Sequence, residues 1–414
     1  MRWRPRCVRC CRQGSRLPPE PGDRPTLRLL PGHGRRLKAG HPWAFSNEIA
    51  MKPEYRALPP GAPVRLEGDD GWRFGTFAFN PHSLIAARQL DRDPGAAIDA
   101  AFLRRRLDSA AGLRARVCDG PYHRLVHAEA DRLPGLIIDR YGDVLAVQAN
   151  TAAMDRLLPD LTAVLGEMFA PRAIVARNDS HARVQESLPQ HVTLLAGSDA
   201  AAVVEEGGVT FPVDPLAGQK TGFFFDQRPN RDRVAALAAG VRVLDMFCHT
   251  GAFGLRCLAA GAASAVLVDA SAAALEAAGT AAARNGLAGR SERRRGDAFE
   301  VLAALHAAGE QFDIVICDPP AFAPTKKDQA AGLRAYGRMA RLAAPLVAPG
   351  GLLFVASCSH HAPAEMFAAA VADGLHRARR DGRILATTGA GPDHPVHPLL
   401  PESAYLKAQL IQLL

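Results

Sequence analysis

The sequence predicts an α/β protein whose C-terminal half is a parallel-dominated sheet with helices on both faces. From about residue 200 onward, short apolar runs alternate with alanine-rich segments of helical length, the pattern of a parallel sheet with crossover helices. Several of these runs end in an acid, a tight glycine turn or a proline pair. Ligands bind at such carboxyl ends of strands, so we expect the functional site at this edge of the sheet.

Composition limits the class of protein. The chain has 414 residues, 48% hydrophobic and 22% charged, which predicts a globular protein of two or three domains. No apolar run reaches the roughly 18–20 residues that a membrane helix needs. The net charge of +8 favours a polyanionic partner, although codon bias towards arginine and alanine could produce the same excess.

The eight cysteines do not suggest a disulfide framework. Cys7, Cys10 and Cys11 cluster near the N-terminus and the others are scattered, with no repeated pair that would complete a zinc site. We therefore expect no metal and a reducing, cytoplasmic environment. Residues 1–25 read as a basic, arginine- and cysteine-rich tail, expected to be disordered, with a solvated tail favoured over an RNA-touching arm.

Residues 26–95 read as a small β-barrel of short strands and glycine turns. The alternation in residues 72–79 predicts a half-buried strand, and the interleaved aromatic residues are expected in the barrel core rather than stacked on bases. A basic turn contains Arg35, Arg36 and Lys38, which we assign to contacts with RNA phosphates.

Residues 96–199 read as a compact α+β domain. A helix is expected over 98–116, with Arg104 to Arg106 on its solvated face, and a second helix over 154–169. Strands are expected at 122–129, 135–139, 144–148 and 173–176. No cluster of reactive residues stands out here, so the default function of this domain is positioning or substrate contact.

Residues 200–414 carry the regular alternation of strands and helices. Strands are expected at 203–206, 209–213, 241–247, 265–269, 292–295, 313–318, 352–358, 384–387 and 406–413. The first two form a pair that leads into the segment KTGFFFDQR at 220–228. Alanine-rich helices fall between most of the later strands.

Acids follow three successive strands of this half. The segment DMFCHTGAFG at 245–254 combines Asp245 and Phe247 with a turn at Gly251, and lacks the glycine spacing of dinucleotide-binding loops. Its single glycine turn fits S-adenosylmethionine better than a pyrophosphate. Asp269 could accept from the ribose hydroxyls, and Asp297 from the adenine amino group. Together these acids predict a site for S-adenosylmethionine.

The fourth strand ends in DPPAF at 318–322. Paired prolines fix the backbone and remove two amide donors, so nearby carbonyls are expected to face a pocket. Asp318 could contact the cofactor or the polar edge of a base, and Phe322 could stack on a flipped base. A strand that simply ends in two prolines is the alternative.

Cys358 lies at the end of the fifth strand. Carbon 5 of a pyrimidine is a poor nucleophile, but a thiolate that adds to carbon 6 makes carbon 5 enamine-like and able to attack a methyl sulfonium. Cysteine suits this chemistry because it is nucleophilic near neutral pH and leaves readily. We expect Cys358 to be catalytic, although a lone cysteine is otherwise most often a small buried residue.

The chain resembles, over residues 26–414, the bacterial large-subunit ribosomal RNA cytosine-5 methyltransferases that carry an N-terminal PUA domain. The matching stretches are HPWAFS at 41–46, DRLPGLIID at 131–139, KTGFFFDQR at 220–228, DPPAF at 318–322, SCS at 357–359, DHPV at 393–396 and YLK at 405–407. The resemblance implies a PUA domain, a central α+β domain and a Rossmann-like class I methyltransferase domain. It also implies S-adenosylmethionine as donor, ribosomal RNA as substrate and Cys358 as nucleophile. We further assign Lys220 to the cofactor site and Arg228 to the substrate.

Two departures from the family pattern concern turnover. Ala321 stands where the family usually has lysine, so one phosphate or base contact is expected to be missing. More distant RNA cytosine-5 methyltransferases use a second cysteine in this loop to release the product, but Cys317 is expected to point away from the pocket, so release would need another base. Two alternatives stay open: methylation of a guanine nitrogen, which needs no thiol, and a non-catalytic RNA-binding assembly factor. The sequence leaves the target nucleotide and the oligomeric state open, a homodimer included.

Overall fold

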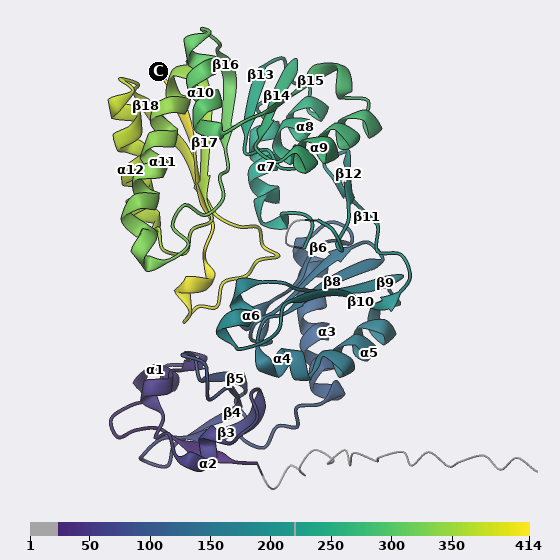
Figure 1. The fold of residues 1–414 in the computed structure, drawn as a ribbon, viewed down its shortest axis with the longest axis vertical. Coiled ribbons are helices and arrows are strands. Elements are labelled where there is room, and N and C mark those ends of the chain that lie inside the picture. Colours follow the sequence, from purple (N-terminus) through teal and green to yellow (C-terminus); the bar gives the residue numbers. More distant parts are fainter. Residues whose placement is uncertain (1–23, 219–220) are drawn as a thin grey trace, which may run out of the picture.

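The computed structural model describes residues 24–218 and 221–414. Three sheet-containing parts follow one another along the long axis of the molecule, from the N-terminal part at the bottom of Figure 1 to the C-terminal part at the top. Almost all of the expected tail, and Lys220, lie outside the described residues. Within these residues, no helix is both long and apolar enough to cross a membrane.

The N-terminal part is a five-stranded sheet that curls towards closure. Its strand order is β1 (Thr26–Arg28), β3 (Ala62–Glu67), β4 (Arg73–Phe79), β5 (Ala87–Asp91) and β2 (Trp43–Ala44). Only the β1–β3 pairing is parallel. A bridge between Leu29 and Ile49 joins the end of β1 to the segment after β2, so the two edges of the sheet meet.

The prediction of a half-buried strand at 72–79 is wrong. All of β4 except Arg73 is buried, because both of its faces are covered. Phe77 and Phe79 point into the core of the N-terminal sheet. Ala78, on the other face, packs with Phe102 and Leu103 of helix α3 (Ala100–Val117). This strand therefore helps to join the first two parts of the molecule.

The central part is a five-stranded sheet flanked by helices. Its strand order is β10 (His191–Gly197), β9 (Ala173–Asn178), β8 (Val144–Ala149), β7 (Leu136–Tyr141) and β6 (Tyr122–His127). Besides α3, the helices are α4 (Ala152–Arg156), α5 (Leu158–Phe169) and α6 (His181–Gln185).

Three details of this part differ from expectation. Strand β10 was not predicted, and the helix expected over 154–169 is divided into α4 and α5, with a proline in the first turn of α5. Arg106 does not lie on a solvated face, because its guanidinium donates to the Asp91 carboxylate at 2.8 Å and to the Leu90 carbonyl at 3.0 Å.

A two-stranded hairpin leads from the central sheet into the C-terminal sheet. The hairpin comprises β11 (Ala202–Glu206) and β12 (Val209–Val213). The sheet has the order β15 (Ser291–Arg295), β14 (Ser264–Asp269), β13 (Arg242–Met246), β16 (Phe312–Cys317), β17 (Val347–Ser357), β19 (Lys407–Leu413) and β18 (Gly382–Thr388). Strands β13 to β17 are parallel, and β19 runs antiparallel to both neighbours.

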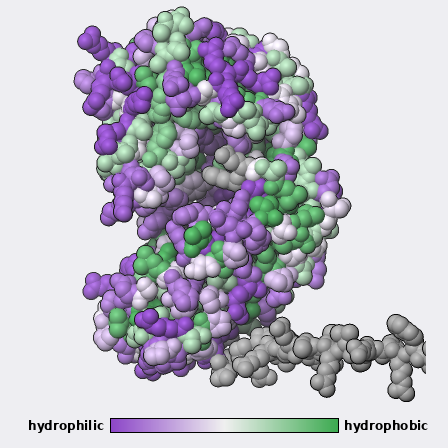
Figure 2. Space-filling view, viewed as in Figure 1, coloured by the Kyte–Doolittle hydropathy of each residue, from purple (hydrophilic) through white to green (hydrophobic). Residues whose placement is uncertain are grey.

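Helices cover both faces of the C-terminal sheet, as predicted (Figure 1). One buried cluster lies under α7 (Arg228–Ala235), α8 (Ala252–Ala259) and α9 (Ala272–Arg284). A second cluster lies under α10 (Ala298–Ala307), α11 (Gln329–Ala343) and α12 (Ala364–Arg377). Hydrophilic residues cover most of the face shown in Figure 2, where the surface is hollowed between the C-terminal and central parts.

Candidate functional site

The turn after β13 has an unusual backbone. Phe247 (φ 60°) and His249 (φ 49°) are left-handed although neither is glycine, and Gly251 (φ 74°) follows. Residues of this kind are costly in the left-handed region and collect at ligand sites when the surrounding structure holds them there. Here Cys248 N donates to the Val268 carbonyl at 2.9 Å and fixes the turn to β14. The structure thus holds a tight, rigid loop at the carboxyl edge of the sheet.

The glycines of this loop serve packing. A Cβ atom added to Gly254 would lie 2.3 Å from Leu267 Cδ2, and one added to Gly251 would lie 3.0 Å from Leu267 Cδ1 and 3.3 Å from Ala278 Cβ. Helix α8 can approach β14 and α9 only if both positions lack a side chain. The glycine turn was related only to the cofactor in the prediction, so this close packing was not foreseen.

The acids at the carboxyl ends of β13 and β14, and the acid just after β15, each accept hydrogen bonds from backbone amides. Asp245 is buried, and its Oδ2 accepts from Gly254 N at 2.9 Å. Asp269 is half-buried and accepts from His249 N at 2.9 Å and from Ser271 N at 2.8 Å. Asp297 caps α10 by accepting from Phe299 N at 2.9 Å. A carboxylate oxygen can accept more than one hydrogen bond, so these bonds orient the acids and leave acceptor capacity for a ligand.

Burial has the largest influence on the pKa of Asp245, and its neighbours adjust it. Burial raises its pKa to about 7, the amide of Gly254 acts in the opposite direction, and the nearby carboxylates of Asp318 and Asp269 raise it further. Asp245, Asp269 and Asp318 thus lie close enough to influence one another, which places the ends of three parallel strands in one site.

An aromatic cluster adjoins these acids. The Phe322 ring lies 4.9 Å from that of Tyr336, 6.0 Å from that of Phe299 and 6.2 Å from that of Phe247, measured between ring centroids. Phe247, Phe299 and Phe322 are half-buried. Carboxylates beside half-buried rings suit the hydroxyls, amino group and flat base of an adenosine. These carboxylates and aromatic rings therefore fit S-adenosylmethionine. Stacking of Phe322 on a target base stays a prediction.

A buried hydroxyl network joins the DPPAF loop to the SCS loop. Ser357 Oγ donates to the Tyr336 hydroxyl at 2.9 Å, and that hydroxyl shares a hydrogen bond of 2.8 Å with Ser359 Oγ. Ser359 Oγ also accepts from Ala323 N at 3.0 Å. Tyr336, Ser357 and Ser359 have no exposed surface. Burial raises the pKa of Tyr336, so its hydroxyl stays protonated.

Cys358 lies between the two serines of this network and is half-buried. Its Sγ lies 4.0 Å from the Pro319 carbonyl oxygen, so the thiol faces the DPPAF loop. Lys407, opposite Ser357 in the β17–β19 ladder, is buried, and its Nζ donates to the carbonyls of Ser359 (2.5 Å) and Tyr405 (3.0 Å). Burial lowers the pKa of Lys407 to about 8, and Cys358 acts in the opposite direction.

Cys317 has a different environment. Its side chain is fully buried in the cluster under α10 to α12. Burial raises the pKa of this thiol well above its usual value, so the thiolate is strongly disfavoured. Tyr336 and Lys407 were missed as site residues because neither lies beside a strand-end acid or a proline pair. The segment YLK at 405–407 contributes to the family resemblance, but no function was predicted for Lys407.

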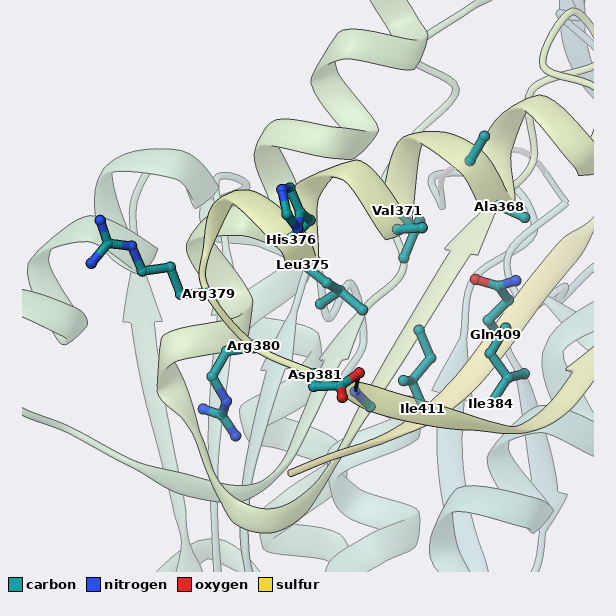
Figure 3. Close-up of a pocket in the computed structure, with 13 residues that line it drawn as sticks. Ala368, Val371, Leu375, His376, Arg379, Arg380, Asp381, Ile384, Gln409 and Ile411 are labelled. Carbon is teal, nitrogen blue, oxygen red and sulfur yellow. Dashed lines mark hydrogen bonds between the residues drawn. The ribbon is translucent and has the colours of Figure 1, made fainter.

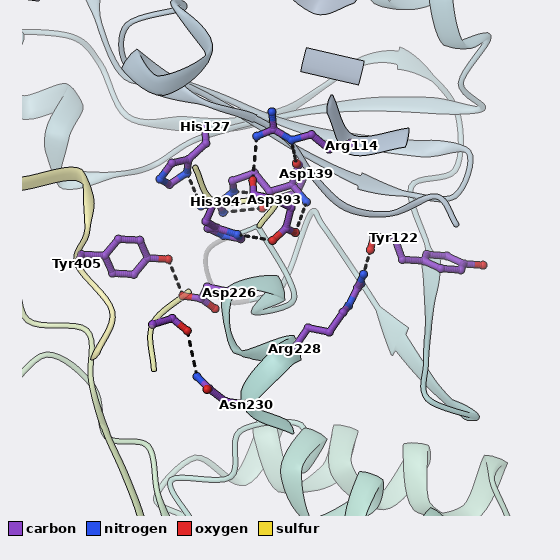
Figure 4. Close-up of polar contacts among 12 residues, drawn as sticks. Arg114, Tyr122, His127, Asp139, Asp226, Arg228, Asn230, Asp393, His394 and Tyr405 are labelled. Carbon is purple, nitrogen blue, oxygen red and sulfur yellow. Dashed lines mark hydrogen bonds and ion pairs between the residues drawn. The ribbon is translucent and has the colours of Figure 1, made fainter. Parts of the chain in front are cut away.

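Arg228 and two residues of the basic turn form ion pairs. Arg228 donates to the Tyr122 carbonyl (Figure 4) and to Glu206 at 3.1 Å, so it links the central sheet and the hairpin. The expected basic turn is a short helix, α1 (Arg35–Lys38), in which Arg36 pairs with Glu48 at 3.0 Å and Lys38 with Asp70 at 2.5 Å. Arg35 is exposed. The assignment of these residues to RNA stays a prediction.

A polar cluster between the central sheet and the segment before β19 was not foreseen (Figure 4). Asp393 accepts from Arg124 N at 3.0 Å and lies 2.8 Å from His394 Nδ1, while its carbonyl accepts from Arg114 at 2.9 Å. Burial opposes the charge of Asp393, but the bonds from His394 and Arg124 lower its pKa to about 2. The cluster fixes the segment that leads to Tyr405 and Lys407.

A separate cavity lies at the β18 edge of the C-terminal sheet, away from the site described above. About 690 Å³ opens between α12 and strands β18 and β19, lined by residues such as Leu375, Ile384 and Ile411 (Figure 3). None of the acids, rings or thiols described above lines it. No group of three or more histidine, cysteine, aspartate or glutamate residues in the described part of the chain could hold a metal ion.

Comparisons with known proteins identify two families and several relatives. A PUA-like domain family matches residues 27–92, and the S-adenosylmethionine-dependent methyltransferase family matches residues 133–376. The protein named ribosomal RNA large subunit methyltransferase I from Shewanella amazonensis is 38% identical over 388 residues, covering 92% of this chain and 97% of the relative. Its namesake from Aeromonas hydrophila is 35% identical, covering 94% and 99%.

Two solved structures share the fold over nearly the whole chain. One, from Streptococcus mutans, has a proposed S-adenosylmethionine-dependent methyltransferase activity. It has a TM-score of 0.78 at 20% identity, covering 94% of this chain and 100% of that one. SMU.776, solved in complex with SAH, has a TM-score of 0.80 at 20% identity with the same coverage.

Proposed function

The chain belongs to the family of S-adenosylmethionine-dependent methyltransferases, and from this premise we propose that it methylates carbon 5 of a cytosine in large-subunit ribosomal RNA. The observation that carries the proposal is the placement of the Cys358 thiol against the DPPAF loop. Methylation of a ring nitrogen needs no thiol, whereas methylation of carbon 5 does. The names of the relatives support the choice of RNA, and the PUA-like domain supports an RNA partner.

Bound S-adenosylmethionine would supply a methyl group on a sulfonium. Asp269 would accept from the ribose hydroxyls and Asp297 from the adenine amino group, beside the loop of Asp245, Phe247 and Gly251. Asp318 would contact both the cofactor and the base. Lys220 belongs to the same proposal, although it lies outside the described residues.

The thiolate of Cys358 would add to carbon 6 of the cytosine and make carbon 5 nucleophilic. Carbon 5 would then take the methyl group as the methyl–sulfur bond of the sulfonium breaks and a neutral thioether leaves. A base would remove the proton from carbon 5, the electron pair would re-form the double bond between carbons 5 and 6, and the thiolate would leave. Lys407 and Cys358 influence each other electrostatically, and Lys407 Nζ supports the loop that carries the thiol by donating to the Ser359 carbonyl. Tyr336 is a positioning residue, since it holds the loops on both sides of the thiol.

The proposed product can be tested directly. RNA incubated with the protein and isotopically labelled S-adenosylmethionine should yield labelled 5-methylcytidine on nucleoside mass analysis. A methylated guanosine would support the guanine-nitrogen alternative. Absence of any labelled nucleoside, with RNA binding intact, would favour a non-catalytic RNA-binding factor.

The ribose assignment predicts the effect of Asp269→Ala on cofactor binding. Loss of the proposed hydrogen bonds to the ribose hydroxyls should weaken S-adenosylmethionine binding by about 1–3 kcal/mol. Isothermal titration calorimetry measures the change, and Asp373→Ala, an exposed acid on α12, is the control. Unchanged affinity for Asp269→Ala would remove this residue from the proposed site.

The hydroxyl network predicts the effect of Tyr336→Phe on turnover. The change leaves Ser357 and Ser359 without their shared partner, at a cost of about 1–3 kcal/mol. We expect kcat to fall on the order of 10- to 100-fold with the KM for S-adenosylmethionine near its wild-type value. Tyr55→Phe, which removes a hydroxyl bonded to the Thr26 carbonyl, is the control. A wild-type kcat in Tyr336→Phe would show that the network does not position the thiol.

A further inference from the structure

A small polar pocket lies where the three parts of the molecule meet. Its volume is about 50 Å³, and its lining includes Arg92 after β5, Arg132 after the turn that follows β6, and His397 in the segment before β19. A buried water needs about 10–15 Å³ by the same measure, so the pocket has room for several waters or for one phosphate group. Segments far apart in the sequence therefore build one polar recess.

The acids of this lining are already neutralised. Asp91 accepts from Arg106 at 2.8 Å, and Glu129 accepts from Arg88 at 2.8 Å and from the indole nitrogen of Trp43 at 2.8 Å. In contrast, Arg92 and Arg132 form no ion pair with any residue of 24–218 or 221–414. The pocket lining thus includes two exposed arginines whose guanidinium groups have no ion-pair partner among these residues.

The backbone at Arg132 is held in place, while its side chain is exposed. Its φ of 57° lies in the left-handed region, which a non-glycine residue occupies at a cost. The preceding residue, Asp131, is fixed by Arg114 through two bonds of 2.6 and 2.8 Å and accepts from His127 N at 2.6 Å. Arg114 is buried, so a rigid core contact holds the turn that carries Arg132.

His397 contributes a polar group whose charge depends on its neighbours. Burial lowers its pKa below the usual value, Glu129 opposes this, and His41, Arg132 and Arg92 lower it further. The imidazole is therefore neutral near pH 7 when the pocket holds no anion. An anion between these cations would favour the charged imidazole, because it would offset their repulsion.

We propose that this pocket binds a phosphodiester group of the substrate RNA between the guanidiniums of Arg92 and Arg132. Guanidinium groups suit phosphate because their planar donors match pairs of phosphate oxygens. The inference rests on the proposed RNA substrate and is independent of which atom of the base is methylated. The segment 389–406 carries both His397 and Tyr405, and Tyr405 bonds to Asp226 at 2.5 Å. A phosphate in this pocket would anchor the RNA on the segment that leads to Lys407.

The test compares two double variants of the full chain that remove the same charge. Arg92→Gln/Arg132→Gln empties the pocket of its unpaired cations, whereas Arg379→Gln/Arg383→Gln removes two exposed arginines near α12 and β18. The probe is a fragment of large-subunit ribosomal RNA, with binding measured over a range of salt concentrations. We expect the pocket variant to bind about tenfold more weakly. Its slope of log K against log salt should fall by about 0.7–0.9 for each phosphate that the variant no longer neutralises. The control should bind nearly as wild type does, and both variants should keep wild-type affinity for S-adenosylmethionine.

The outcomes separate the pocket from the proposed function. If the wild type binds RNA and the pocket variant loses no more affinity than the control, the pocket is overturned and the proposed function stands. If the wild type does not bind the RNA, both are overturned. A further double variant, Arg35→Gln/Arg36→Gln, tests α1 as the alternative RNA-binding surface. A loss of RNA affinity confined to that variant would also overturn the pocket.

Discussion

Replacement of Cys358 by alanine is expected to abolish RNA methylation while S-adenosylmethionine affinity stays near its wild-type value. The thiol is proposed to attack the base and does not hold the cofactor, whereas Lys407 holds the loop through the Ser359 carbonyl, which alanine at position 358 retains. Removal of a nucleophile typically lowers kcat by a thousandfold or more, on the order seen for catalytic serines. Methyl incorporation into RNA and calorimetry with S-adenosylmethionine measure the two effects separately.

A trapped intermediate gives a second measurement of the same chemistry. With RNA that contains 5-fluorocytosine, the wild type should accumulate a covalent adduct, because fluorine cannot leave as a proton and the thiolate cannot be eliminated. Cys317→Ala is the matched control and should still form the adduct, since Cys317 is fully buried in the core. Substantial methylation by Cys358→Ala would show that the carbon-5 mechanism is wrong and would favour the guanine-nitrogen alternative.

The fold of the C-terminal half could be predicted because its signals are local. Each apolar run and the acid near its end, such as Asp245 in β13 or Asp269 in β14, lie within a few consecutive residues. In a parallel sheet those ends meet at one edge, so the cofactor acids could be grouped without knowing any contact. Strand β10 was missed because all of its residues are exposed or only half-buried, which leaves no apolar pattern.

The remainder of the site depends on contacts between distant segments. Tyr336 reaches Ser357 and Ser359 from the middle of α11, and its position in the sequence resembles that of any buried helix residue. The burial of both faces of β4 likewise depends on α3, which no alternation within the strand could reveal. Arg228 was assigned to the substrate from its motif, whereas its partner Glu206 lies in another element.

Glu206 also contacts residues that are distant in the sequence. Of the substitutions considered, its removal should lower the free energy of unfolding the most. It ends β11 and is buried among three guanidiniums, with Arg231 at 2.5 Å, Arg256 at 3.0 Å and Arg228 at 3.1 Å. These arginines lie on α7 and α8, so one carboxylate ties the linking hairpin to the C-terminal sheet. The close fit extends to Gly207, where an added Cβ would lie 2.0 Å from the Arg256 guanidinium.

Glu206→Ala is therefore expected to lower the free energy of unfolding by about 3–5 kcal/mol, because it leaves buried guanidiniums without their counter-charge. Glu205→Ala, an exposed neighbour in the same strand, should change it by no more than about 0.5 kcal/mol. Denaturant unfolding followed by circular dichroism measures both variants. Equal stabilities would mean that solvent or Asp232, which also pairs with Arg256, compensates for the missing carboxylate.

The same carboxylate predicts how the wild type responds to acid. Burial would raise the pKa of Glu206, but Arg231, Arg228 and Arg256 together lower it from 4.5 to about 2. Because the folded-state pKa is the lower one, this group stabilises the fold fully above about pH 5 and loses that contribution as the pH falls towards 2. The free energy of unfolding should therefore fall more steeply with acid in the wild type than in Glu206→Ala. Parallel curves for the two proteins would show that Glu206 is not ionised in the folded state.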